Sequence, residues 1–211
     1  MSPEDTKKLH KILIVGGGAG GLELATKLGD SLGRKNKAII TLVDSKKTHV
    51  WKPLLHEIAA GSLNPEKDEL DYLAQSHWHN FKFRLGRMIN LNRNKKEIIL
   101  EAFKDENGNE IIPKRKFYYD TLIISVGSTI NDFGIKGAAQ NTIALDTQDQ
   151  AERFHQKLHN AILKAQTQSS DDFGFPLKEP EQLEVVIVGA GATGVELAAE
   201  LHKATRDMTA Y

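Results

Sequence analysis

A glycine pattern near the start of the sequence constrains the fold more than any other feature. Gly16, Gly18 and Gly21 follow a short β-branched run at residues 11–15, and apolar side chains recur at helical spacing after them. The first glycine permits a tight turn, the second lets a diphosphate approach the backbone, and the third lets helix and strand pack closely. A glycine turn can also serve packing alone. As a nucleotide site, its expected contacts are Gly16, Gly18, Ala19, Gly20 and Gly21.

The next β-rich run favours the nucleotide site. Residues 37–43 read as a strand that ends at Asp44, about 20 residues after the last glycine, where a carboxylate can accept hydrogen bonds from a ribose. A strand–helix–strand unit of this length implies parallel strands with a right-handed crossover. The sequence therefore predicts an α/β, Rossmann-like domain with a parallel sheet. Asp44 and Ser45 join the expected cofactor-binding residues.

The same pattern occurs again near the end of the sequence. Gly189, Gly191 and Gly194 follow a β-rich run, and their flanking residues match those of the first copy at most positions from Ile14–Leu28 to Ile187–Leu201. The two copies lie too far apart for a solenoid repeat and suit two nucleotide-binding domains. We expect Gly189, Gly191, Thr193 and Gly194 to bind a second dinucleotide. The acid that would distinguish NADH from NADPH in this copy falls past Tyr211.

The remaining segments are assigned from periodicity and turn residues. Asn64 and Thr147 are expected to cap helices. The predicted helices cover residues 53–60, 64–76, 146–165 and 193–205. The predicted strands cover 121–126 and 183–188, a β-meander fills 81–119 with a strand at 81–91, and 166–180 reads as a loop.

Composition excludes several classes of function. Lys plus Arg and Asp plus Glu both number 28, so the basic excess typical of nucleic-acid binding is missing. The sequence contains no cysteine, which rules out disulfides, iron–sulfur clusters and dithiol redox centres within its 211 residues. No apolar run is long enough for a membrane-spanning helix, and the start of the sequence does not read as a signal peptide. We expect a cytoplasmic protein without a metal site.

Two dinucleotide sites suggest a flavin and a nicotinamide, which exchange a hydride. The order of motifs resembles the pyridine-nucleotide:flavin oxidoreductases, whose Ala-Thr-Gly-type segment against FAD is replaced here by Ser125, Val126 and Gly127. Residues 50–61 (VWKPLLHEIAAG), 86–89, 127–134 and 189–201 resemble type II NADH dehydrogenases more narrowly. The absence of cysteine argues against the disulfide reductases and the sulfide:quinone reductases of the superfamily.

The resemblance implies FAD and NADH as cofactors and a quinone as the electron acceptor. It places Lys52, Pro53, Leu54 and Met88 beside FAD, together with Ser125, Val126 and Gly127. It also places Glu196 near the site of hydride transfer, as the catalytic candidate. Both charged residues have simpler explanations, since an acid stabilises any helix N-terminus and a lysine is often merely solvated.

The resemblance also implies a division of the chain. Residues 1–145 are expected to form the FAD-binding domain, 146–182 a connecting helix and linker, and 183–211 the first strand and helix of an NAD(H)-binding domain. We expect the chain by itself to bind FAD weakly or not at all and not to turn over NADH. Peripheral contact with the cytoplasmic face of the membrane is expected only through a C-terminal region outside it. Apolar side chains around the last helix should favour self-association: Val195, Leu197, Ala198 and Leu201.

Two alternatives stay open at this point. One is another flavin-dependent reductase, such as a ferredoxin or rubredoxin reductase, and the other is a nucleotide-binding module without catalysis. Two smaller features are interpreted as solvated surface: His155 with His159, and the basic clusters at 92–96 and 114–116. For the basic clusters, contact with phosphate or acidic lipid is the alternative.

Overall fold

The computed structural model describes residues 9–168 and 184–209. The chain divides into two compact units, each described separately below. The first comprises Met1–His49 and Glu69–Ser128, and the second comprises Val50–Asp68 and Thr129–Tyr211. These units are defined by compactness, whereas the domain limits expected from the sequence were defined by the order of motifs. Those domain limits therefore stay a prediction.

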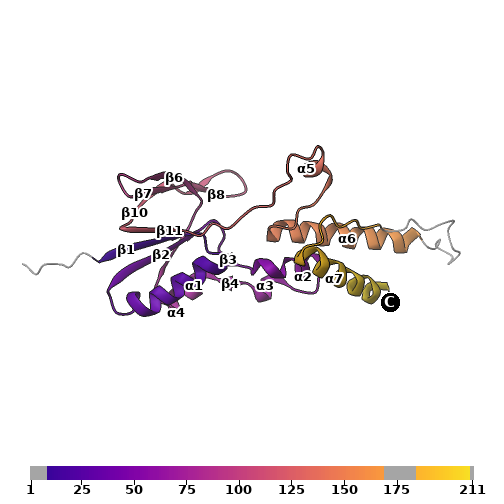
Figure 1. The fold of residues 1–211 in the computed structure, drawn as a ribbon, viewed down its shortest axis with the longest axis horizontal. Coiled ribbons are helices and arrows are strands. Elements are labelled where there is room, and N and C mark those ends of the chain that lie inside the picture. The colour runs from indigo at the N-terminus through magenta and orange to yellow at the C-terminus, as the bar shows by residue number, and fades with distance from the viewer. Residues whose placement is uncertain (1–8, 169–183, 210–211) are drawn as a thin grey trace, which may run out of the picture. The chain divides into compact units, whose positions relative to one another are not determined.

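A four-stranded parallel sheet forms the centre of the first unit (Figure 1). Its strands lie in the order β11 (Thr121–Ile124), β1 (His10–Val15), β2 (Ala38–Asp44) and β5 (Lys82–Leu85). Helix α1 (Ala19–Leu28) and one π-helical turn (Gly29–Gly33) connect β1 to β2, and α4 (Tyr72–Trp78) precedes β5. The predicted Rossmann-like α/β fold with a parallel sheet is confirmed.

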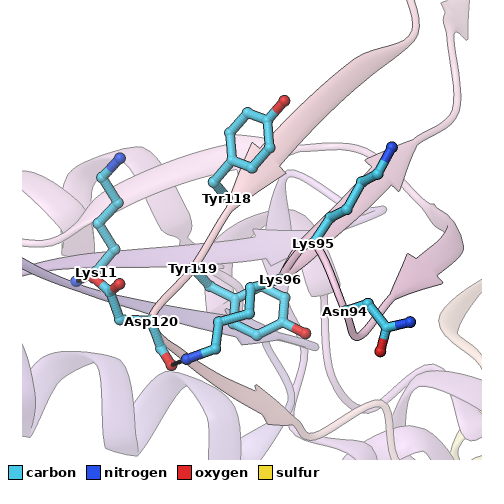
Figure 2. Close-up of a pocket in the computed structure, with 7 residues that line it drawn as sticks. All are labelled: Lys11, Asn94, Lys95, Lys96, Tyr118, Tyr119 and Asp120. Atoms are coloured by element: carbon cyan, nitrogen blue, oxygen red, sulfur yellow. Dashed lines mark hydrogen bonds between the residues drawn. The ribbon is translucent and has the colours of Figure 1, made fainter.

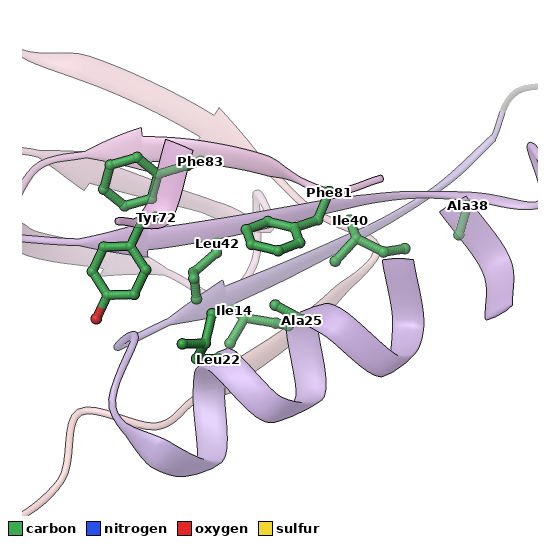
Figure 3. Close-up of a cluster of buried hydrophobic side chains, with 9 residues drawn as sticks. All are labelled: Ile14, Leu22, Ala25, Ala38, Ile40, Leu42, Tyr72, Phe81 and Phe83. Atoms are coloured by element: carbon green, nitrogen blue, oxygen red, sulfur yellow. The ribbon is translucent and has the colours of Figure 1, made fainter. Parts of the chain in front are cut away.

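One face of this sheet buries its apolar side chains under α1, and Tyr72 at the start of α4 joins the same cluster (Figure 3). Ile14, Ile40 and Leu42 point from the strands toward Leu22 and Ala25 of α1 because alternate residues of a strand share a face. The ring of Tyr72 stacks on Phe83 with 4.9 Å between centroids. These contacts hold α1 and α4 on the sheet and so position the turn that precedes α1.

Small antiparallel sheets complete the first unit. The meander consists of β10 (Arg115–Tyr118), β7 (Glu97–Leu100) and β6 (Met88–Asn92), and its Ile98 and Leu100 pack against Leu13, Val15 and Val43 on the other face of the parallel sheet. The two remaining pairs are β3 (Thr48–His49) with β4 (Leu70–Asp71), and β8 (Phe103–Lys104) with β9 (Glu110–Ile112).

The predicted single strand at residues 81–91 is wrong. It is two strands in different sheets, because Gly86 adopts a φ of +154° and donates its N–H to the Asp44 carbonyl at 2.7 Å, so the chain leaves the parallel sheet there. The predicted single helix at 64–76 is also wrong, because the structure has two separate helices there. Asn64 caps α3 (Pro65–Asp68) as expected, accepting from the Glu66 N–H, and Asp71 then caps α4 by accepting from the Ala74 N–H at 2.8 Å.

Helices make up the second unit. A short 3₁₀ turn (Lys52–Leu54) leads into α2 (Leu55–Ala60), and α3, α5 (Ala138–Asn141), α6 (Gln148–Gln168) and α7 (Ala192–Thr209) complete it. Helix α2 packs on both α6 and α7, and its fully buried Ala59 lets the helices approach closely. Thr147 caps α6 as predicted, accepting from the Gln150 N–H at 3.3 Å.

Some expectations for the second unit are corrected. Leu197 and Leu201 are buried in the core of this unit, whereas Val195 stays exposed, so the apolar surface around α7 is smaller than expected. Residues 184–190 form neither strand nor helix, although a strand was predicted at 183–188; residue 183 lies outside the described part. Most of the predicted loop at 166–180 also lies outside it, and residues 166–168 belong to α6. Of the described helices, none has the length and apolarity needed to cross a membrane.

Candidate functional site

A cavity of about 250 Å³ opens at the carboxyl ends of the parallel strands in the first unit. Its position is a topological switch point, because β2 lies on one side of β1 and β11 on the other, and ligands of open α/β sheets bind at such points. Its lining comprises Val15, Gly16, Val43, Asp44, Ser45, Gly86, Arg87, Met88 and Val126. Gly16, Asp44, Ser45, Met88 and Val126 are among the residues that the sequence predicted.

The glycine turn has the geometry that its spacing predicted. Gly16 adopts a φ of +102°, and a Cβ on Gly21 would lie only 1.8 Å from the Gly16 carbonyl oxygen. The first and third glycines are therefore required by the fold. Gly18 differs, because a Cβ there would meet no atom within 4 Å. The open space at Gly18, next to the free N–H groups at the start of α1, suits an anion such as a diphosphate.

Asp44 is held beside this turn. Its Oδ2 accepts the Gly17 N–H at 2.6 Å, and its Oδ1 accepts the Lys46 N–H at 2.8 Å. These two backbone donors fix the carboxylate at the end of β2, on the wall of the cavity. A carboxylate oxygen has more than one lone pair, so the group can still accept a hydroxyl hydrogen bond.

Tyr72 holds the glycine turn in place from the protein core. The sequence did not predict this role. Its hydroxyl donates to the Gly17 carbonyl at 2.7 Å inside the core. Burial, with a smaller contribution from the Asp44 charge, raises the pKa of the Tyr72 hydroxyl, so it stays a neutral donor. The two residues are 55 positions apart in the sequence, and periodicity within one segment cannot predict a contact over that separation.

The segment after β11 closes the side of the cavity next to Gly16. The Ser125 N–H donates to the Val15 carbonyl at 2.7 Å, and the Ser125 carbonyl lies so close to Gly16 that a Cβ there would clash with it. Gly127 follows with a φ of +75°. Ser125 also comes within ordinary contact distance of a Cβ placed on Gly20. The structure thus brings the two predicted FAD segments, the glycine turn and Ser125–Gly127, together in the first unit.

The second glycine turn repeats the geometry of the first. Gly189 has a φ of +110°, a Cβ on Gly194 would lie 2.1 Å from the Gly189 carbonyl oxygen, and a Cβ on Gly191 would meet nothing within 4 Å. The Val195 N–H donates to the Gly191 carbonyl at 3.1 Å, as the Leu22 N–H does to the Gly18 carbonyl at 2.9 Å. Thr193 lies in the first turn of α7. The repeat seen in the sequence is therefore a repeat of backbone conformation as well.

A polar group in the second unit contains the other predicted residues. His56 is buried on α2, its Nδ1 lies 2.8 Å from the Pro53 carbonyl and 3.5 Å from Oε2 of Glu196, and the Glu196 side chain is half exposed. Lys52 forms an ion pair with Asp146. The sequence did not single out His56 or Asp146, although His56 stands in the VWKPLLHEIAAG segment. The structure thus brings Pro53 and Glu196 together at one histidine. Lys52 and Leu54 belong to the same 3₁₀ turn as Pro53.

The position of His155 differs from the one expected from the sequence. It was interpreted as part of a solvent-facing stripe, but its Nδ1 is buried without a hydrogen-bond partner among the described residues, and its ring lies only 2.4 Å from the position of a Cβ on Gly61. Packing of α2 on α6 accounts for its burial.

Comparison with known proteins agrees with this geometry. A model of the pyridine nucleotide-disulphide oxidoreductase family matches residues 10–210. The chain belongs to this family. It matches without a cysteine of its own, so a dithiol centre within these 211 residues is excluded.

Comparison with individual proteins shows which members of the family this chain resembles. This chain is 44% identical over 209 residues to the type II NADH:quinone oxidoreductase of Haemophilus influenzae. The aligned region covers 96% of this chain and 47% of that protein. The type II NADH:quinone oxidoreductase of Staphylococcus haemolyticus is 28% identical over 194 residues, 90% of this chain and 42% of its own length. The chain spans about half the length of the curated relatives it matches. The resemblance to type II NADH dehydrogenases seen in the sequence is confirmed.

A solved structure extends the agreement to the fold. The structure of NDH2 from Plasmodium falciparum in complex with RYL-552 matches with a TM-score of 0.76 and 23% sequence identity, over 96% of this chain and 38% of that one. At this identity the match concerns the fold alone.

Proposed function

We propose that this chain provides the FAD site, and the start of the NADH site, of a type II NADH:quinone oxidoreductase. The cavity between the first glycine turn and Asp44 is the observation that carries the proposal. The 44% identity to the Haemophilus influenzae enzyme supports the choice of NADH and quinone. When bound, FAD supplies the redox chemistry, accepting a hydride from NADH and passing two electrons to the quinone.

The residues of the first unit fit FAD. The open space at Gly18 would hold the diphosphate, since backbone N–H groups at the start of α1 favour an anion. Asp44, already oriented by the Gly17 and Lys46 N–H groups, would accept a ribose hydroxyl. Gly86 and Met88 line the same cavity, and the backbone of this segment would contact the adenine. The first unit would thus supply an anion site at Gly18, and a ribose acceptor and an apolar wall in the cavity.

In the second unit we assign Glu196 to the hydride-transfer site. The Nδ1–H of His56 points to the Pro53 carbonyl, and Glu196 lies close enough to the same nitrogen to be oriented by it. The carboxylate keeps half of its surface exposed, so a substrate can reach it. Lys52 is neutralised by Asp146, so stabilising a reduced flavin would require that it exchange this partner.

FAD binding by the chain tests the first part of the proposal. Adding FAD in excess should shift the amide resonances of Gly16–Gly18, Asp44 and Met88. Gly16, Asp44 and Met88 line the cavity, and Gly17 and Gly18 continue the glycine turn that would hold the diphosphate. Asp44→Asn should weaken the affinity about tenfold by removing a charged acceptor, whereas the exposed Glu106→Gln should not change it. Equal affinities for the two variants, or shifts away from the cavity, would contradict the assignment.

A chimaera tests the activity. The matching segment of the Haemophilus influenzae enzyme is replaced by this chain, and NADH oxidation is measured with a quinone acceptor. We expect FAD binding and quinone-dependent turnover, with Glu196→Gln lowering kcat and Glu200→Gln, one turn further along α7, leaving it unchanged. A chimaera that folds and binds FAD but fails to oxidise NADH would refute the proposed activity for this chain.

A further inference from the structure

A second hollow lies at the opposite end of the parallel strands from the glycine turn. Its volume is about 380 Å³, and three lysines and two tyrosines contribute to its lining: Lys11, Lys95, Lys96, Tyr118 and Tyr119. Lys11 stands near the start of β1, whereas Val15 at the end of this strand lines the proposed FAD cavity. A strand rises about 3.3 Å per residue, so the two hollows are separated by the length of β1. The second hollow therefore has no part in the proposed redox site.

Positive charge dominates this hollow. Asp120 is the acid of its lining, and its carboxylate accepts the backbone N–H of Lys11 at 2.8 Å. Lys96 Nζ lies 3.5 Å from the carbonyl oxygen of Asp120, a long contact with a neutral group. Within residues 9–168 and 184–209, the ammonium groups of Lys11, Lys95 and Lys96 form no ion pair with a carboxylate. The hollow thus offers three cations that no carboxylate of the described residues contacts directly.

The backbone beneath these lysines is fixed. The Lys96 carbonyl accepts the Tyr119 N–H at 3.0 Å, and the Lys11 carbonyl accepts the Asp120 N–H at 2.9 Å, which ties the turn after β6 and the start of β1 to the same segment. Lys96 itself adopts a φ of +47°, where glycine or asparagine is usually found. Lys96 thus places a cation at a backbone position that usually carries a residue without a long side chain.

The side chains border the hollow from several sides. Figure 2 shows Lys11 and Lys95 on either side of Tyr118, with Lys96 reaching toward Asp120 beneath them. Tyr118 is more than half exposed, and its ring and hydroxyl border the opening. Ammonium groups are compact charges with three donors each, which suits the oxygens of a phosphate approached from several directions.

We propose that this hollow binds a phosphate monoester. The three ammonium groups match its two negative charges, and the volume leaves room for the group that the phosphate carries. The chemistry is shared by a soluble phosphate ester and by the headgroup of phosphatidic acid. The proposal rests on the lysine geometry of the first unit and is independent of the redox function.

Phosphate titration of the chain tests the site. Inorganic phosphate and glycerol phosphate, added at constant ionic strength, should shift the resonances of Lys11, Lys95, Lys96 and Tyr118 in a saturable manner. Lys11→Gln with Lys95→Gln should weaken binding about tenfold, since two of three cations are lost. The matched control, Lys104→Gln with Lys114→Gln, removes two exposed lysines of the same unit and should leave binding unchanged.

Further arms separate the sources and the failures. Co-sedimentation with phosphatidylcholine vesicles that contain phosphatidic acid, lost in the double variant, would assign a lipid source, and saturable binding of glycerol phosphate without vesicle binding would assign a soluble ester. Equal losses in the control variant, or no saturable shift with any probe, would overturn the proposal. If the double variant unfolds, Lys95→Gln alone, on an exposed turn, repeats the comparison.

Discussion

At the scale of single residues, the three glycines of the first turn should respond differently to alanine. A Cβ at Gly21 would lie 1.8 Å from the Gly16 carbonyl oxygen, so Gly21→Ala should lower the free energy of unfolding by about 2–4 kcal/mol. Gly18 has an ordinary φ of −59° and no neighbour for a Cβ, so Gly18→Ala should change stability by less than about 0.5 kcal/mol. Urea unfolding of both variants measures the difference.

Gly18→Ala should nevertheless weaken FAD binding, because its methyl group would occupy the space proposed for the diphosphate. A titration of the folded variant with FAD checks this. If its affinity equals that of the unmodified chain, the diphosphate does not approach the backbone at Gly18.

Tyr72 is a second residue whose contribution can be isolated. Tyr72→Phe keeps the ring on Phe83 but leaves the buried Gly17 carbonyl without the hydroxyl that donates to it at 2.7 Å. We expect a loss of about 1–2 kcal/mol in the free energy of unfolding. Tyr118→Phe, at an exposed tyrosine of the same unit, should cost much less. Equal losses in the two variants would show that the Gly17 contact contributes nothing specific.

His49 should make stability depend on pH. Burial lowers the pKa of His49 below its usual 6.5, and the Asp44 charge offsets this only in part. Between that lowered pKa and about 6.5 the unfolded chain binds a proton that the folded chain does not, so stability falls as the pH falls through this range. His49→Gln should flatten this part of the profile, whereas the exposed His77→Gln should not. Urea unfolding between pH 5 and pH 8 provides the measurement, and parallel profiles for His49→Gln and the unmodified chain would contradict the prediction.

At the scale of elements, the packing of α2 on α6 and α7 should stabilise the second unit. Leu201 is 7% exposed in this cluster, so Leu201→Ala should cost about 2–4 kcal/mol through lost burial and a cavity. Leu163 of α6 is 46% exposed, and Leu163→Ala should cost less than about 1 kcal/mol. Hydrogen exchange of the α2 amides reports the effect; comparable rates in both variants would mean that α7 does not support α2.

Elements with local signals were predictable from the sequence, and those that depend on distant partners were not. Both glycine turns and the caps at Asn64 and Thr147 combine a residue type with a fixed spacing, and the structure contains them. Apolar side chains recur along the run at 81–91, and the conformation of Gly86 divides it between two sheets. A strand also needs a neighbour to hydrogen-bond with, and the described residues provide none beside 184–188.

The candidate site follows the same rule. Gly16, Asp44 and Met88 lie at the cavity because strand ends and glycine turns can be located from local patterns. Tyr72 and His56 reach their partners through the packing of separate elements, Tyr72 on β5 and His56 beside α7. Such contacts depend on tertiary arrangement, and a pattern within one segment contains no record of them.

At the scale of the whole molecule, the two glycine turns stand in different surroundings. The first follows a strand inside a completed parallel sheet, with neighbours on both sides. The second follows residues 184–188, whose Val186 and Val188 are 83% and 87% exposed. Apolar side chains this exposed, at alternate positions of a β-prone run, favour association with another surface.

We therefore expect the chain to self-associate as its concentration rises. Sedimentation velocity over about a hundredfold range of concentration should show a rising average mass, because burying exposed apolar surface is favourable. Val186→Ser with Val188→Ser should reduce the association, whereas Ile111→Ser, at an isoleucine that is 59% exposed in the first unit, should not. A mass independent of concentration would show that the exposed valines at 186 and 188 do not drive association. An equal effect of Ile111→Ser would show that the association depends on exposed apolar side chains in general and not on this run.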